Sequence, residues 1–191
     1  MAHLQGDDRN NFLEKMRESA LTKQDLDILS GRKYGLTTFH KKLYIEKDWD
    51  EPQWQKFFSE NTWIFGYGLD YRFLSILQKE AAVSDVDVDG KDTVKSDFLL
   101  GSTDFTVLVE LKRPDTLLFE QGKNRSHSWR LSQYLVHAVS QILAQKAAWE
   151  IKSSQTNFDE NGQPIIQKTS DPKAILIIGR KDEIDGNPRD F

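Results

Sequence analysis

The sequence predicts a mixed α/β fold, and three stretches of the chain support that prediction. Residues 105–114, FTVLVELKRP, are typical of a buried strand that ends at Pro114, because proline cannot donate a hydrogen bond to a strand ladder. Residues 174–178, AILII, form a continuous apolar run, as expected of a strand covered on both faces. Between them, residues 129–150 carry apolar side chains at helical spacing. This order predicts a mixed central sheet flanked by helices.

The composition is that of a globular protein with one main domain. The chain has 191 residues, a formal net charge of −4 and 38% hydrophobic residues. It lacks an apolar run near the roughly 20 residues that a membrane span needs and lacks a signal-peptide core, so we expect a cytoplasmic protein without a membrane partner. The absence of cysteine excludes disulfides and thiolate zinc sites. The acidic balance argues against a general nucleic-acid coat protein.

Two regions are expected along the chain. Residues 1–46 are predicted to form a helical N-terminal appendage, and residues 47–191 the main domain. In the appendage, Thr22 and Asp25 have the spacing of a helix N-terminal capping box. Gly31 follows several apolar residues and is a natural helix stop.

A helix is predicted to begin at Asp50, a good N-cap residue. Its apolar stripe consists of Trp54, Phe57 and Phe58. Glu51 shares the inward side of that stripe by spacing. Two interpretations of Glu51 stay open: its carboxylate stabilises the helix by interacting with the positive end of the helix dipole, or it contributes to a functional site.

Residues 96–100 form a short apolar stretch that Asp97 interrupts, and a turn connects it to residues 105–114. We expect these two strands to pair as an antiparallel hairpin. Because side chains alternate along a strand, Glu110 and Lys112 point to the same face. An acid and a base on an otherwise apolar strand are costly unless they are paired or used.

Asp97, Glu110 and Lys112 therefore form a candidate site. Neighbouring strands lie about 4.8 Å apart, so both carboxylates can reach one divalent cation if they face the same side. Oxygen ligands of this kind suit magnesium. Lys112 is placed to orient a water or to help deprotonate it, and Glu51 would add a third carboxylate. The spacing D-x12-E-x-K is weak as a string, and structural ion pairing is the competing interpretation.

Four cations follow the second strand: Arg113, Lys123, Arg125 and Arg130. Three of them lie in or beside a polar segment, residues 120–128, that is predicted to be a mobile loop. The usual interpretation of such residues is a solvated surface. A local basic strip of this kind can instead contact the phosphates of DNA, where lysine and arginine dominate affinity.

The order of a helix, three strands carrying D and E-x-K, a helix and a strand resembles the core of the PD-(D/E)XK nuclease superfamily. More narrowly, several segments together resemble the nuclease domain of the Shedu family of bacterial anti-phage proteins: DEPQWQKFFSENTWIFG, SDFLL, VELKRP, AVSQIL and AILIIGR. The resemblance covers about residues 50–180. The family pattern continues beyond the last strand, so the domain is expected to be shortened at its C-terminal end.

The resemblance implies a restriction-endonuclease-like sheet and a Mg²⁺- or Mn²⁺-dependent endonuclease that nicks or cleaves double-stranded DNA, of phage or other origin. It also implies self-association into a homo-oligomer and a role in anti-phage defence. Shedu proteins carry varied N-terminal regions, so the resemblance makes a regulatory role for residues 1–46 an expectation. The alternative is a catalytically silent module that keeps the fold and binds DNA or a protein partner.

The resemblance also assigns roles by position. Asp97 and Glu110, with the backbone carbonyl of Leu111, would be metal ligands, and Lys112 would be the catalytic lysine. Glu51 would be the acid of the preceding helix. Gln141 would be the helix glutamine that supports the site, with Gln133 as the alternative.

Overall fold

The computed structural model describes residue 14 and residues 22–65, 74–84, 94–102, 104–167 and 171–185. The chain divides into two compact units, Met1–Asp48 and Trp49–Phe191. Within the described residues, no helix combines the length and the apolar character needed to cross a membrane.

The first unit contains one long helical segment. Helix α2, Lys23–His40, continues directly into the π-helical turn η1, Lys41–Glu46. The predicted capping box is confirmed, since Thr22 Oγ1 accepts a hydrogen bond from the Asp25 amide at 3.2 Å and the Asp25 carboxylate accepts one from the Thr22 amide at 2.9 Å. The predicted stop at Gly31 is wrong. Glycine weakens a helix by roughly 1 kcal/mol but ends it only where the backbone turns left-handed.

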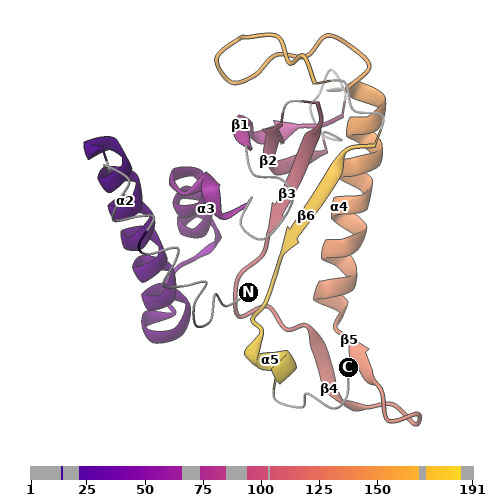
Figure 1. Cartoon of the computed structure of the whole chain (residues 1–191). Coiled ribbons are helices and arrows are strands. Elements are labelled where there is room, and N and C mark those ends of the chain that lie inside the picture. Colours follow the sequence, from indigo (N-terminus) through magenta and orange to yellow (C-terminus); the bar gives the residue numbers. More distant parts are fainter. Residues whose placement is uncertain are drawn as a thin grey trace. The chain divides into compact units, whose positions relative to one another are not determined.

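The second unit contains a four-stranded mixed sheet in the order β1-β2-β3-β6 (Figure 1). Its strands are β1 Ser75–Ala82, β2 Lys95–Gly101, β3 Thr106–Leu111 and β6 Lys173–Ile177. The pairs β1–β2 and β2–β3 are antiparallel, whereas β3 and β6 are parallel. The predicted mixed α/β class and the predicted β2–β3 hairpin are therefore confirmed.

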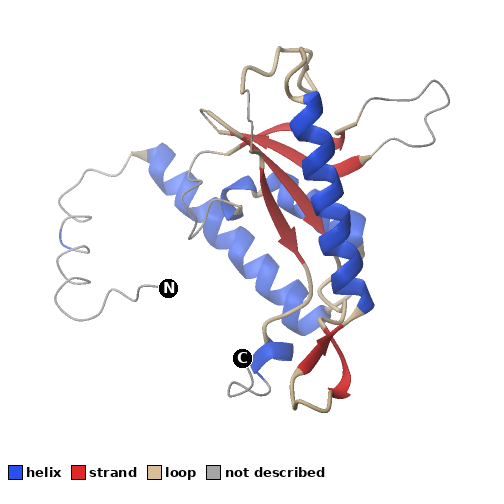
Figure 2. Ribbon diagram, turned by 90° about the vertical axis from the view of Figure 1, so that its right-hand side faces the viewer, coloured by secondary structure: helices blue, strands red, loops and turns tan. Residues whose placement is uncertain are grey.

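Helices cover both faces of this sheet. Helix α3, Glu51–Glu60, lies on one side and helix α4, Gln133–Lys152, runs along the other (Figures 1 and 2). The described part of the unit also contains two short helices: η2, Thr62–Ile64, and α5, Asp182–Asp185. Helix α3 begins at the predicted cap, because the Asp50 carboxylate accepts a hydrogen bond from the Gln53 amide at 3.0 Å.

The core on the α4 side is aliphatic around one tryptophan. Its buried members are Leu77, Ala81, Val83, Leu99, Leu108 and Trp149. The indole Nε1 of Trp149 donates a hydrogen bond to Thr106 Oγ1 at 2.7 Å, so the one polar atom of this large side chain is satisfied inside the core. This packing fixes α4 against β3.

The core on the α3 side is aromatic. Its buried members are Trp54, Phe57, Phe58, Phe65 and Phe98. Phe65 joins helix and sheet, with ring centroids 5.4 Å from Phe58 and 5.6 Å from Phe98. The predicted apolar stripe of α3 is thus buried. Full burial of the last strand is not observed, because β6 is at the edge of the described sheet and its side chains remain partly exposed.

A second, two-stranded sheet replaces the predicted loop and the predicted first turn of the long helix. Strands β4, Phe119–Lys123, and β5, Trp129–Leu131, form a hairpin that we call the β4–β5 arm. The side chain of Asn124 orders its tip by accepting hydrogen bonds from the amides of Ser126 and Ser128 at 2.9 and 3.1 Å. The α4 helix therefore begins only after Ser132, whose hydroxyl caps it.

Candidate active site

Asp97 and Glu110 lie opposite each other on neighbouring strands. Phe98 pairs with Val109 in the antiparallel register of β2 and β3, which places the next residues, Asp97 and Glu110, across from one another. The Asp97 carboxylate contacts Gln55 of α3, and the Glu110 carboxylate contacts Gln145 of α4. The two carboxylates come together at the end of the β2–β3 ladder, where the charge of Glu110 helps to raise the pKa of Asp97.

At the end of the β2–β3 ladder, side chains of β2 form the hydrogen bonds to the backbone of β3. Ser96 Oγ, which is buried, donates a hydrogen bond to the Val109 carbonyl at 3.0 Å. The Asp97 carboxylate accepts a hydrogen bond from the Leu111 amide at 2.7 Å. Because unpaired backbone groups are costly when buried, these two side chains allow the strands to end their pairing without an unsatisfied polar group. Their position also fixes the Asp97 carboxylate beside β3.

Glu110 is a buried carboxylate with a partner on each oxygen. Its side chain is 3% exposed. Oε1 accepts a hydrogen bond from Lys112 Nζ at 2.6 Å, and Oε2 accepts one from Gln145 Nε2 at 2.7 Å. A buried charge is tolerated when it is paired and hydrogen-bonded in this way. The predicted cost of Glu110 and Lys112 on an apolar strand is thus met by direct pairing.

The glutamine that supports Glu110 is Gln145, and the predicted placement of Gln141 is wrong. Gln141 and the alternative Gln133 are both exposed on α4, whereas Gln145 is fully buried. Gln145 lies four residues before Trp149, so it belongs to the buried stripe of the helix. Helical spacing could have indicated that Gln145 is buried, because Gln145 falls on the same face of the helix as Ala138, Ile142 and Trp149.

The two ends of the Gln145 side-chain amide differ in their hydrogen bonding. Nε2 donates both to Glu110 and to the Lys95 carbonyl at 2.7 Å, so it links α4 to β2 and β3. Oε1 is buried and accepts no hydrogen bond from any residue that the structure describes. A buried acceptor without a donor is uncommon and calls for a reason, because it costs free energy. Here the two N–H groups of the Gln145 amide donate to Glu110 and to the Lys95 carbonyl, and these bonds fix the orientation of the amide.

The charges of the site influence one another. Burial raises the pKa of Asp97 to about 6, and the neighbouring charges of Glu110 and Glu51 act in the same direction. For Lys112, burial alone would lower the pKa, but the hydrogen bond to Glu110 and the surrounding carboxylates outweigh it and raise the pKa above its ordinary value. Lys112 is therefore held as an ammonium ion.

Helix α3 contributes two polar residues one turn apart. The charge of Glu51 is near enough to raise the pKa of both Asp97 and Lys112. Gln55 Nε2 lies 3.4 Å from Asp97 Oδ1, a long hydrogen bond. Sequence reasoning named Glu51 but missed Gln55, because a glutamine beside an aromatic stripe carries no distinctive signal.

The donor set suits a hard divalent cation. Magnesium is usually bound by one or two carboxylates, completed by waters and by a substrate phosphate. Asp97 and Glu110 supply two such groups, and the repulsion between them is what a cation would relieve. Among the described residues there is no group of three or more His, Cys, Asp or Glu side chains that forms a ready-made cage. The role of the Leu111 carbonyl stays a prediction.

The four predicted DNA-contacting cations differ in their surroundings. Arg113 makes a two-point ion pair with Asp115, at 2.8 and 2.6 Å. Arg130 pairs with Glu120 at 3.3 Å. The remaining two are Lys123, whose Nζ lies 5.4 Å from the centre of the Trp129 ring, and Arg125, an exposed residue at the tip of the β4–β5 arm. Of the four, exposed Arg125 is the cation best placed for an external anion.

Asp97→Asn is expected to stabilise the metal-free protein. The folded-state pKa of Asp97 is raised to about 6, so the charged carboxylate costs stability above that pH and the cost disappears as the pH falls below the unfolded-state value. After allowance for solvent screening, we expect a gain of about 1–2 kcal/mol at pH 7.5. Urea unfolding in EDTA at pH 7.5 and pH 4 measures it. An equal effect at both pH values would contradict the assignment.

Comparison with known proteins places the chain in a family. The family model described as Shedu protein SduA, C-terminal, matches residues 48–190. A curated relative, Shedu protein SduA of Bacillus cereus (strain B4264), is 25% identical over 210 aligned residues, which cover 96% of this chain and 54% of the relative. The chain thus spans about half the length of that relative. On the match to the family model, which includes the whole candidate site, this chain belongs to the Shedu family.

Proposed function

We propose that the second unit is a metal-dependent DNA endonuclease of the PD-(D/E)XK type that acts in anti-phage defence. One observation carries the proposal: Asp97 and Glu110 oppose each other where β2 and β3 stop pairing, and Lys112 is hydrogen-bonded to Glu110. Two carboxylates that repel one another, beside a fixed ammonium group, are suited to a phosphodiester and a divalent cation. A purely structural ion pair would not require Asp97.

The site residues have distinct tasks in this proposal. Asp97 and Glu110 would hold Mg²⁺ or Mn²⁺, which when bound supplies Lewis-acid stabilisation of the negative charge that develops on the phosphate. Gln145 keeps the Glu110 carboxylate in one orientation, because both partners are buried and its amide is also tied to β2. Glu51 adds negative charge from α3, which favours cation binding without requiring direct contact.

Lys112 acts as an acid and as a positive charge rather than as a base. Its raised pKa keeps Nζ protonated near neutral pH, so it is not free to take a proton from water. A protonated Nζ can donate a hydrogen bond to a phosphate oxygen and can deliver a proton to the departing oxygen. This refines the role expected from the sequence, in which deprotonation of water was one option.

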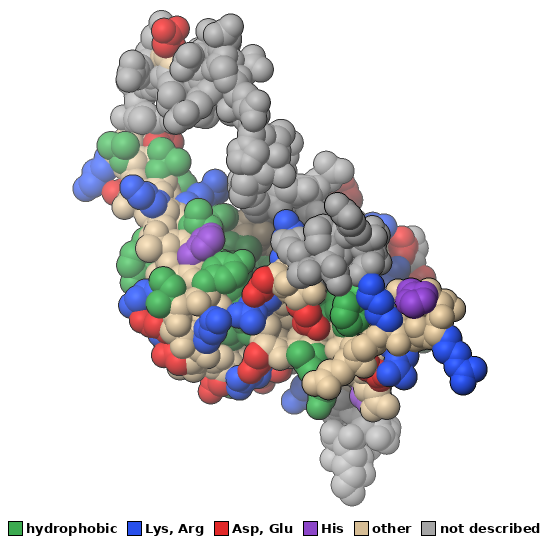
Figure 3. Space-filling model, turned by 90° about the horizontal axis from the view of Figure 1, so that it is seen from below, with side chains coloured by type: hydrophobic (Ala, Val, Ile, Leu, Met, Phe, Trp, Pro, Cys, Tyr) green, Lys and Arg blue, Asp and Glu red, His purple; other side chains and the backbone are tan. Residues whose placement is uncertain are grey.

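The β4–β5 arm is the proposed contact for the DNA backbone outside the site. Lys and Arg side chains stand along this protruding arm, at the right of Figure 3. Arg125 is the principal candidate, since Arg113 and Arg130 are engaged with Asp115 and Glu120, and Lys123 lies over the Trp129 ring. Phosphate contacts of this type hold DNA without regard to its sequence and weaken with salt.

A plasmid assay tests the proposal. Supercoiled DNA is incubated with the protein and Mg²⁺ or Mn²⁺, and conversion to open-circular or linear DNA is followed. We expect cleavage that EDTA abolishes and that falls by at least about 100-fold in an Asp97→Asn, Glu110→Gln variant. The matched control is Glu60→Gln, Glu150→Gln, which removes two exposed carboxylates elsewhere in the same unit.

The same assay separates the second candidate function. Both Glu110 oxygens already have protein partners, which favours a silent module in which Lys112 and Gln145 have replaced the cation. That module would bind DNA in a salt-sensitive manner and leave it uncut with every divalent metal. Cleavage that survives in the doubly substituted variant would contradict both interpretations of the site.

A further inference from the structure

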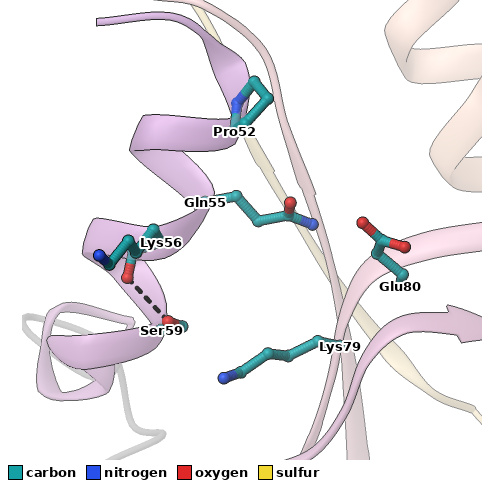
Figure 4. A pocket seen from close by; sticks show the side chains of 6 residues that line it. All are labelled: Pro52, Gln55, Lys56, Ser59, Lys79 and Glu80. Atoms are coloured by element: carbon teal, nitrogen blue, oxygen red, sulfur yellow. Dashed lines mark hydrogen bonds between the residues drawn. The ribbon is translucent and has the colours of Figure 1, made fainter.

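A polar hollow of about 320 Å³ lies between helix α3 and strand β1 (Figure 4). Its lining residues are Pro52, Gln55, Lys56, Ser59, Lys79 and Glu80. Pro52 supplies the only apolar side chain, and no aromatic ring is present among these residues. Pockets for apolar ligands and platforms for nucleic-acid bases are built from aliphatic or aromatic side chains. This hollow is instead suited to a charged, hydrophilic ligand.

An unusual backbone shapes the wall that β1 provides. Consecutive strand residues normally point to opposite faces, yet Lys79 and Glu80 both line the hollow. Glu80 has a φ of 46°, in the left-handed region that residues with a side chain rarely adopt. Such a conformation costs roughly 1–2 kcal/mol and tends to persist at functional sites, where the surrounding structure holds it.

The hollow adjoins the candidate active site in two ways. Lys79 pairs with Phe98 and Ala81 pairs with Ser96, which places Glu80 opposite Asp97 on the neighbouring strand. From the other wall, Gln55 lines the hollow and also directs its Nε2 to Asp97 Oδ1. Gln55 would therefore separate a ligand in the hollow from the Asp97 carboxylate and could contact both.

The charged side chains of the hollow have no ion-pair partner within the part of the chain that the structure describes. Lys56, Lys79 and Glu80 make no ion pair with any described residue, which leaves an excess of one positive charge. In Figure 4 the Lys79 side chain extends from β1 toward α3, and Gln55 extends from α3 toward β1. An ammonium group and an amide that extend into one open space from its two walls can both donate hydrogen bonds to a phosphate.

We propose that this hollow is a subsite for the sugar–phosphate backbone of the cleaved DNA strand, in which Lys79 contacts a phosphate next to the scissile one. The proposal rests on the proposed endonuclease function, because only a reacting phosphate at Asp97 places the next phosphate here. Gln55 links the two positions: it contacts Asp97 on one side and the neighbouring phosphate on the other. Glu80 limits the affinity of the subsite by its negative charge.

Charge substitutions of opposite sign test the subsite. Binding of a short fluorescent DNA duplex is measured by anisotropy at several salt concentrations, in a Lys112→Ala background that prevents cleavage. Lys79→Gln is expected to weaken binding about 3- to 10-fold and to reduce the slope of log K against log salt by about 1. Glu80→Gln is expected to tighten binding about 2- to 3-fold. Lys33→Gln and Glu150→Gln, at exposed positions outside the hollow, are the matched controls.

A backbone substitution then locates the contact. A single uncharged methylphosphonate is moved along one strand of the duplex, position by position. At one position, the methylphosphonate should weaken DNA binding by the protein that retains Lys79 as much as the Lys79→Gln substitution does. At that position, the methylphosphonate should cause no further loss of binding by the Lys79→Gln protein. Equal losses in both proteins at every position, or weaker binding by Glu80→Gln, would overturn the subsite.

The two proposals fail in different ways. If the protein that retains Lys112 nicks plasmid but the Lys79→Gln variant binds DNA normally, the subsite proposal is wrong and the endonuclease proposal is unaffected. If the protein with Lys112 never cleaves DNA under any divalent metal, the endonuclease is wrong and the subsite falls with it.

Discussion

Lys112→Ala is expected to reduce plasmid nicking by about 100- to 1,000-fold, the usual effect of removing one group that stabilises charge in a transition state. Nζ is held as an ammonium by Glu110 and the nearby carboxylates, so its loss removes both a positive charge and a proton donor. Initial rates of conversion of supercoiled plasmid, at saturating Mg²⁺ or Mn²⁺, measure the effect. Unchanged nicking by a preparation free of contaminating nuclease would end the assignment of Lys112.

A conservative variant separates charge from proton transfer. Lys112→Ala also leaves the buried Glu110 with one partner fewer, so a moderate loss of stability accompanies it, and circular dichroism must show that it is folded. Lys112→Arg keeps the ion pair and the positive charge, but a guanidinium does not release its proton near neutral pH. Activity that remains low in Lys112→Arg supports proton donation, whereas recovery would show that charge alone is sufficient.

Gln145→Glu is expected to destabilise the second unit by about 3–5 kcal/mol at pH 7.5, the range found when a buried charge lacks compensation. The new carboxylate would take the place of an amide that lies 2.7 Å from Glu110 Oε2 and 2.7 Å from the Lys95 carbonyl. The oxygens of these groups would then face one another without a proton donor. Thermal or urea unfolding, with the signal of the buried Trp149 as the probe, measures the loss.

The pH dependence and a neighbouring control make this prediction specific. Burial and the charge of Glu110 would raise the pKa of the introduced carboxyl group above its value in the unfolded chain, so its cost is present at pH 7.5 and diminishes as the pH falls. Gln141→Glu makes the same chemical change one turn earlier on the exposed face of α4 and is expected to alter stability by less than about 0.5 kcal/mol. Comparable losses in the two variants would contradict the role of Gln145.

Local patterns predicted much of the scaffold. The alternation of β3 indicated that Leu108, Glu110 and Lys112 share a face, and the structure places Leu108 in the α4-side core and Glu110 on Gln145. Capping boxes begin at Thr22 and Asp50 because a side-chain oxygen satisfies a free amide that lies within the next turn of the chain. Such features depend on neighbouring residues only.

Other features depended on distant residues and were missed. Trp129 was assigned to a helix, but Phe119 lies close to it in space, with ring centroids 6.1 Å apart, and the pair helps to form the β4–β5 arm. The base of the arm is held by Glu183, whose carboxylate accepts hydrogen bonds from the amides of Leu118 and Phe119. A contact between residues so distant in the chain leaves no trace in local spacing. The left-handed backbone of Glu80 was equally invisible.

The sequence by itself determined the strand that carries Glu110 and Lys112, the cap and aromatic stripe of α3, and the family to which the chain is similar. These follow from periodicity, capping and motif order, which are local properties of the chain. Helical spacing can place Gln145 on the buried face of α4, but only the tertiary structure decided that this residue reaches Glu110, because the packing of Trp149 sets how that face lies against the sheet. It also decided that Gln55, which reaches Asp97, shares a hollow with Lys79 and Glu80, since a helix and an edge strand come together there only in the folded protein.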